Sequence, residues 1–178
     1  RALNIGCLYQ NPLRGTAPNL TIEENLALAY TRKASPSFFA LNKKDSAYFR
    51  EVLSTLGMGL EDRMKTKIGL LSGGQRQAAS LLMATIAEPE LLLLDEHTAA
   101  LDPGAAEKVM ALTKKIVEEN KITTLMITHD MEYALEYGSR TIMLDSGKIV
   151  MDLTGKEREE MTTGKLAELF YGKAHKKG

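Results

Sequence analysis

The sequence has little cysteine, no excess charge and no long apolar run, and each absence excludes a class of protein. It has one cysteine, Cys7, in 178 residues and no excess charge, since Lys plus Arg and Asp plus Glu both total 23. One cysteine excludes an internal disulfide framework, and balanced charge argues against nucleic-acid binding, which usually goes with a basic excess. No apolar run approaches the roughly 18 residues of a membrane-spanning helix, and the first residues lack the pattern of a secretory signal.

The first part of the chain predicts one strand followed by helices. The alternating apolar run 3–9 has the period of a strand. Thr21 and Glu24 form a capping box for a helix over 22–30, and Asp45 is the predicted N-cap of a second helix. Residues 31–44 read as an irregular connection. We predict a helical subdomain here.

The rest of the chain alternates apolar strands with helices. This alternation is typical of an α/β domain with a parallel sheet. The predicted elements are a helix after 71–75, a strand at 91–94, a helix begun by Asp102-Pro103, a strand at 123–128, a short helix at 131–137, a hairpin of 141–144 and 148–151, and a short helix at 166–170 before a frayed basic tail.

Two acids follow the apolar strand 91–94 directly. Asp95 and Glu96 therefore lie at the carboxyl end of a buried strand, where α/β sheets bind their ligands. A carboxylate there suits Mg²⁺, and a second one can deprotonate a water for attack on a phosphate. A strand that simply ends in two solvated acids is the plain alternative, and these residues alone leave the two even.

The string Leu71-Ser72-Gly73-Gly74-Gln75 favours the chemical interpretation. Its glycines allow backbone N–H groups to approach an anion, and the following helix turns its positive end toward it. Together with the Asp-Glu pair, the string resembles the nucleotide-binding domains of ABC ATPases. It matches their LSGGQ signature; 91–96 match the Walker B strand, Ala100-Leu101-Asp102 the D-loop, His129 the switch histidine and Gln10 the Q-loop glutamine.

The resemblance implies a P-loop NTPase-like (RecA-like) α/β core with an inserted helical subdomain. Its implied parts are the end of an N-terminal strand with the Q-loop (1–18), the helical subdomain (19–70), the catalytic core (71–155) and a C-terminal helix and tail (156–178). It also implies ATP and Mg²⁺ as cofactors, and a head-to-tail pair of ATPase subunits, identical or not. The pair would serve transmembrane permease subunits from the cytoplasmic face of the membrane, without nucleic acid.

The resemblance also implies roles for individual residues. Glu96 is the expected general base, with His129 at the γ-phosphate and Gln10 sensing Mg²⁺ and the attacking water. Asp95 is the expected Mg²⁺ ligand, through water and beside Gln10. The expected nucleotide-binding residues, some of them acting on ATP held mainly by the other subunit, are Ser72, Gly73, Gly74, Gln75 and Asp102.

Three departures from the family pattern stand out. No G-x-x-x-x-G-K-[ST] loop occurs, so we expect the chain to be truncated before the Q-loop and inactive alone. His97 stands where the commoner pattern has proline, and Ala99 where it has serine. His97 is not expected to be a second base, because Glu96 already fits that role.

The predicted function is the ATPase subunit of an ABC transporter. The sequence of residues 95–102 resembles a subgroup of bacterial importers. The alternatives are a non-transport ABC ATPase and a catalytically inactive fragment that keeps only the dimer interface. About 60 residues between Gln10 and Leu71 leave no room for the long coiled coils of DNA-repair types.

Overall fold

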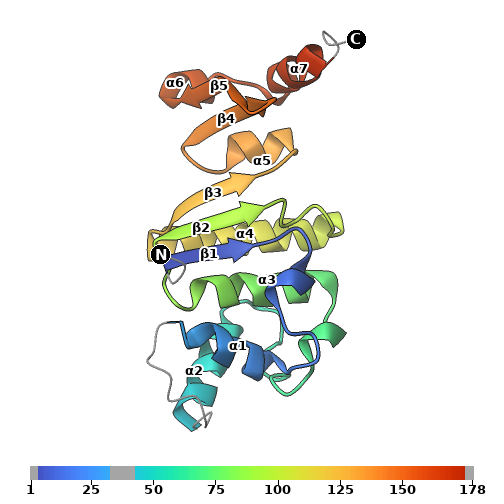
Figure 1. The fold of residues 1–178 in the computed structure, drawn as a ribbon, viewed down its shortest axis with the longest axis vertical. Coiled ribbons are helices and arrows are strands. Elements are labelled where there is room, and N and C mark those ends of the chain that lie inside the picture. The colour runs from blue at the N-terminus through green and yellow to red at the C-terminus, as the bar shows by residue number, and fades with distance from the viewer. Residues whose placement is uncertain (1–3, 33–42, 175–178) are drawn as a thin grey trace. The chain divides into compact units, whose positions relative to one another are not determined.

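The computed structural model describes residues 4–32 and 43–174 and divides into two compact units, residues 1–127 and 128–178. Figure 1 shows the order of their elements along the chain. Within the described ranges, no helix is both long and apolar enough to span a bilayer. Each unit is described by itself below.

The first unit is built on a three-stranded parallel sheet. Its strands are β1 (Ile5–Leu8), β2 (Leu91–Asp95) and β3 (Thr123–Ile127), in the order β1-β2-β3 (Figure 1). In the register Leu8 lies beside Leu94, and Asp95 beside Ile127. All three strands therefore end at one edge of the sheet, where the residues that follow them can meet. The α/β class with a parallel sheet is as predicted.

One face of this sheet carries the core. Leu92 and Leu94 of β2 are buried in an apolar cluster with side chains of α3 (Gly73–Thr85) and α4 (Pro103–Asn120). On β3 the alternate residues Leu125 and Ile127 are each 54% exposed. The pleat sends successive side chains to opposite faces, so the two helices cover one face of the sheet.

Gly6 sets how closely β1 approaches α3. A Cβ at this position would lie 2.5 Å from the carbonyl oxygen of Ala84 and 3.1 Å from the Leu92 side chain. The first of these contacts is with helix backbone, which cannot rotate away. Glycine is therefore required here by the close packing of strand and helix.

Two further helices share a core with α3. The helix α1 (Ile22–Tyr30) begins at the predicted Thr21–Glu24 capping box, and α2 spans Lys43–Ser54. The buried carboxylate of Glu23 on α1 accepts hydrogen bonds from Ser46 of α2 and from Lys65. The cluster that α1, α2 and α3 share includes Ile22, Leu26, Phe49, Leu53, Ile68, Ala78 and Leu82.

One helix start was predicted wrongly in this region. Asp45 lies inside the first turn of α2 and is not its N-cap. An acid is favourable at both positions, because each lies near the positive end of the helix dipole. The pattern alone did not separate them. Most of the connection predicted at 31–44 falls outside the described residues.

In its described residues, 128–174, the second unit contains a hairpin and three helices. They are α5 (Met131–Glu136), β4 (Arg140–Asp145), β5 (Lys148–Thr154), α6 (Gly155–Glu159) and α7 (Thr163–Ala174). The hairpin is confirmed, with Asp145 paired to Lys148 across the turn. The helix α6 was not predicted. The helix α7 is longer than the predicted 166–170, since polar residues at its outer positions hide the helical period in the sequence. Residues 175–178 of the expected basic tail lie outside the described range.

Candidate functional site

The side chains that follow β1 and β2 meet at the carboxyl edge of the sheet. The Gln10 amide Nε2 donates a hydrogen bond to the Glu96 carboxylate Oε2 at 3.1 Å. These residues lie 86 positions apart in the sequence. The parallel register brings them together, since Leu8 and Leu94 are neighbours two residues earlier in each strand. The structure thus joins two of the predicted catalytic residues.

Glu96 has an unusual backbone conformation. Its φ is 44°, in the left-handed region that residues other than glycine seldom adopt. Two hydrogen bonds hold it there: its N–H donates to the Ile127 carbonyl at 3.0 Å, and its own carbonyl accepts from the Ala99 N–H at 3.0 Å. Residues kept in such conformations cluster at active sites. The turn therefore presents the carboxylate from a fixed backbone.

Asp95 fits the position of a metal ligand. It is the exposed last residue of β2, one position before Glu96. Within the described residues, no group of three or more His, Cys, Asp or Glu side chains surrounds it. The carboxylates of Asp95 and its neighbour Glu96 fit Mg²⁺ bound to a nucleotide, because Mg²⁺ in such sites takes one or two protein carboxylates, substrate phosphates and water.

The signature residues start α3 with a reciprocal cap. The Ser72 hydroxyl accepts from the Gln75 N–H at 3.3 Å, and the Gln75 side-chain oxygen accepts from the Ser72 N–H at 3.3 Å. Ser72 and Gly73 are exposed at this helix start. The start of α3, near the positive end of its dipole, is thus exposed at Ser72 and Gly73, as an anion site requires.

The signature and D-loop segments lie against each other. A Cβ on Gly73 would come within 3.2 Å of Leu101 Cδ2, and a Cβ on Gly74 within 2.9 Å of Ala105 Cβ. The starts of α3 and α4 are therefore in close contact. Asp102 is the predicted N-cap of α4, with its Oδ1 accepting from the Ala105 N–H at 3.0 Å. The sequence did not predict that these glycines pack against the D-loop and the start of α4, where a side chain would not fit.

Two side chains after the signature hold this arrangement and were not predicted. The Arg76 guanidinium donates to the carbonyls of Ile68, Gly69 and Leu71 and so fixes the segment before the signature. Gln77 is fully buried, and its Nε2 donates to the Tyr9 carbonyl at 3.4 Å, next to Gln10. The available signal was polar residues at buried positions of an apolar helix.

His97 is a buried side chain beside the candidate base. It is 3% exposed, and its Nε2 lies 3.2 Å from Thr113 Oγ1 on α4. The Thr113 hydroxyl donates its one proton to the Val109 carbonyl at 2.8 Å, so the His97 Nε2–H is the donor toward Thr113. Burial lowers the pKa of the His97 imidazole to about 4. The imidazole is thus enclosed and neutral at ordinary pH, and that His97 is not the base stays a prediction.

His129 belongs to the second unit. It is exposed and follows β3 by two positions, immediately before Asp130, the N-cap of α5. The Asp130 carboxylate accepts from the N–H groups of Glu132 and Tyr133, and its own N–H donates to Thr128 Oγ1. The predicted position of His129 at a strand end is confirmed. Its part in a nucleotide site stays a prediction.

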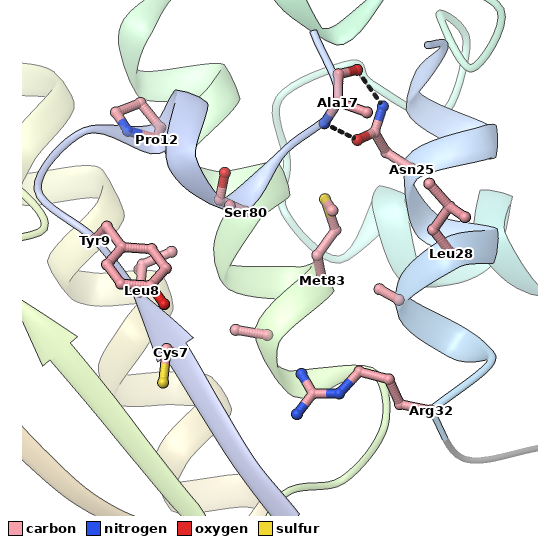
Figure 2. A pocket seen from close by; sticks show the side chains of 13 residues that line it. Cys7, Leu8, Tyr9, Pro12, Ala17, Asn25, Leu28, Arg32, Ser80 and Met83 are labelled. Atoms are coloured by element: carbon pink, nitrogen blue, oxygen red, sulfur yellow. Dashed lines mark hydrogen bonds between the residues drawn. The ribbon is translucent and has the colours of Figure 1, made fainter. Parts of the chain in front are cut away.

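A cavity of about 250 Å³ lies beside the strand that leads to Gln10. Figure 2 shows Cys7 and Tyr9 of the β1 segment on one side, Met83 of α3 behind, and Leu28 of α1 opposite. Asn25 is buried at its border, where it accepts from the Ala17 N–H at 2.8 Å and donates to the Ala17 carbonyl at 3.1 Å. The walls therefore combine α1 and α3 with the segment that carries Gln10.

The sequence is similar to those of known transport proteins. Residues 1–99 match the family model described as ABC transporter. A tyrosine transport ATP-binding protein of Clostridioides difficile is 42% identical over 92% of this chain and 65% of its own length. A phosphonates import ATP-binding protein of Oceanobacillus iheyensis is 35% identical over 84% of this chain and 58% of its own length. The chain thus spans less than two thirds of the length of these relatives.

Solved structures show the same fold. The inward-facing structure of a metal-chelate type ABC transporter matches with a TM-score of 0.73 and 25% identity, over 94% of this chain and 64% of its own. The cbiO1 protein of Clostridium perfringens, part of the transporter complex cbiONQ, matches with a TM-score of 0.70 and 20% identity, over 94% and 63%.

Proposed function

This chain belongs to the ABC transporter family, and from that premise we propose that it is part of an ATP-hydrolysing subunit that powers a bacterial importer. The contact between Gln10 and Glu96 at the carboxyl edge of the sheet carries the proposal. It supplies a carboxylate held by a neutral amide, beside the exposed acid Asp95. Relatives that are named as transport and import ATP-binding proteins support a role in transport over a non-transport ABC ATPase.

The residues divide the chemistry of ATP hydrolysis among them. Glu96 takes a proton from the attacking water as the oxygen approaches the γ-phosphate, and Gln10 orients that water and the carboxylate. Asp95 would hold Mg²⁺. When bound, Mg²⁺ neutralises charge on the phosphate oxygens. His129 stabilises the charge that develops on the γ-phosphate.

The signature residues act on a second nucleotide. Ser72, Gly73 and Gly74 present a hydroxyl and helix N–H groups to the γ-phosphate of ATP held by a partner ATPase subunit. Gln75 keeps Ser72 in place through the reciprocal cap, and Asp102 lies at the seam between the subunits. The exposure of Ser72, Gly73 and Asp102 supports a face that meets a partner.

These 178 residues contain no G-x-x-x-x-G-K-[ST] loop to grip the phosphates of the subunit's own nucleotide. We expect the isolated chain to show no saturable ATP binding by calorimetry at millimolar nucleotide, because a lysine and N–H-rich loop usually supply that grip. The complete gene product that carries this chain is the comparison. Tight binding by the isolated chain would place the grip in the residues described here.

The permease partner is proposed to dock over the cavity beside Gln10. A segment seated there touches α1 and the strand that leads to the catalytic amide (Figure 2). Such contact can link transport to hydrolysis from the cytoplasmic face of the membrane. The transported substrate is then selected by the permease and any binding protein.

A charged residue at the rim of this cavity tests the docking. Leu28 is 41% exposed and lines the cavity, so Leu28→Asp is expected to reduce the permease that co-purifies with the complete gene product from detergent by about tenfold, as for a desolvated charge at an interface. Leu169→Asp in α7 is the matched control, because Leu169 is also 41% exposed and lies in the second unit. Equal recovery of permease by both variants would move the docking site elsewhere.

A further inference from the structure

We propose that His97 is a positioning residue for Glu96, and that its hydrogen bond to Thr113 anchors the turn that presents the Glu96 carboxylate. This inference rests on the proposed function, because it takes Glu96 as the general base. It concerns a residue that the chemistry itself does not use. It also gives a physical reason for the histidine at this position.

Backbone hydrogen bonds hold the turn after β2 to the sheet edge. Glu96 has a φ of 44°, and its backbone is joined to β3 through the Ile127 carbonyl and to Ala99 farther along the turn. These bonds fix the peptide groups around Glu96 within the sheet edge and the turn. They do not connect the turn to α4, the helix that lies against the covered face of the sheet.

His97 makes this connection. Its imidazole is enclosed, at 3% exposure, and donates from Nε2 to Thr113 Oγ1 at 3.2 Å. Thr113 is itself 5% exposed and is fixed by its bond to the Val109 carbonyl in the preceding helical turn. The hydroxyl is thus oriented to accept, and the pair contains a defined donor and a defined acceptor. Hydrogen bonds of this enclosed kind specify one arrangement of the groups they join.

Because His97 follows Glu96 directly in the chain, the anchoring of His97 also restrains Glu96. Peptide geometry holds consecutive Cα atoms 3.8 Å apart, so a displacement of His97 carries the Glu96 backbone with it. Misplacing a catalytic group by about 1 Å can cost about 100-fold in rate. The proline of the commoner family pattern restrains the chain by its ring, and His97 supplies its restraint through the side chain.

The test uses the complete gene product and compares matched threonine variants. Thr113→Val keeps the shape but removes the acceptor, and we expect kcat for ATP hydrolysis to fall about tenfold while KM for ATP stays within about twofold, because the base acts in the chemical step. Thr113→Ser keeps the hydroxyl that accepts the bond, and His97→Gln keeps an N–H that can donate it. Both variants are expected to keep kcat within about threefold of wild type.

Thr85→Val is the control for packing. Thr85 is a buried helical threonine that donates to a carbonyl four residues earlier, as Thr113 does, but belongs to α3. Thr113→Val should lower the resistance to denaturant more than Thr85→Val, because it also leaves the buried His97 Nε2–H without its acceptor. In nucleotide-free protein, the backbone amide resonance of Glu96 should shift in Thr113→Val and not in Thr85→Val.

The outcomes separate this inference from the proposed function. A kcat in Thr113→Val no lower than in Thr85→Val, with an unshifted Glu96 amide, overturns the positioning role even if stability falls. Glu96→Gln is measured alongside as the reference for the base. If that variant still turns over ATP, the proposed function fails. If it is inactive and Thr113→Val is normal, the positioning inference alone fails.

Discussion

Glu96→Gln in the complete gene product is expected to lower ATP turnover by about 100-fold or more, the range of general-base catalysis, while ATP-driven dimerisation persists. Glutamine has nearly the shape of glutamate, and its side-chain oxygen can still accept the hydrogen bond from Gln10 Nε2. The change therefore removes the proton acceptor and leaves the contact. Steady-state phosphate release measures turnover, and light scattering with and without ATP measures dimerisation.

A matched glutamate separates this effect from a general loss of charge. Glu107 is an exposed glutamate on α4, and Glu107→Gln should keep wild-type turnover. Hydrolysis that survives in Glu96→Gln would remove Glu96 from the role of base. Loss of both hydrolysis and dimerisation would show that the substitution disturbs the turn itself.

Gly6→Ala is expected to have the largest effect on stability. The added Cβ would lie 2.5 Å from the Ala84 carbonyl oxygen, so β1 or α3 has to move. Overpacking against side chains costs about 1–3 kcal/mol, and here the obstacle is helix backbone, so we expect a loss of about 3 kcal/mol or more in the free energy of unfolding. Denaturant unfolding followed by circular dichroism measures it in the 178-residue chain.

A second glycine provides the control for this change. Gly104 lies in α4, and its added Cβ would be 3.6 Å from Asp102 Oδ1, an ordinary contact distance. Gly104→Ala should leave stability unchanged or raise it by up to about 1 kcal/mol, because alanine is the better helix former. A Gly6→Ala variant as stable as Gly104→Ala would show that the approach of β1 to α3 is looser than the structure has it.

Local patterns in the sequence determined the kinds of element and the types of chemistry. The capping boxes at Thr21 and Ser72 are formed by residues three positions apart, so the sequence contains all the information they need. The apolar run before Asp95 determined that two acids end a buried strand. Where the pattern was ambiguous, as at Asp45 and in the polar outer positions of α7, the predicted bounds were wrong.

Tertiary structure decided which of these residues meet. The contact between Gln10 and Glu96 spans 86 residues, and that between His97 and Thr113 spans 16. The register of β1 on β2 sets the first, and the packing of α4 sets the second. Neither the strand register nor the helix packing can be predicted from the local spacing of apolar residues, because both depend on elements distant in the chain. The sequence by itself therefore determined the acids, the glycines and the caps, whereas the folded chain determined their distances.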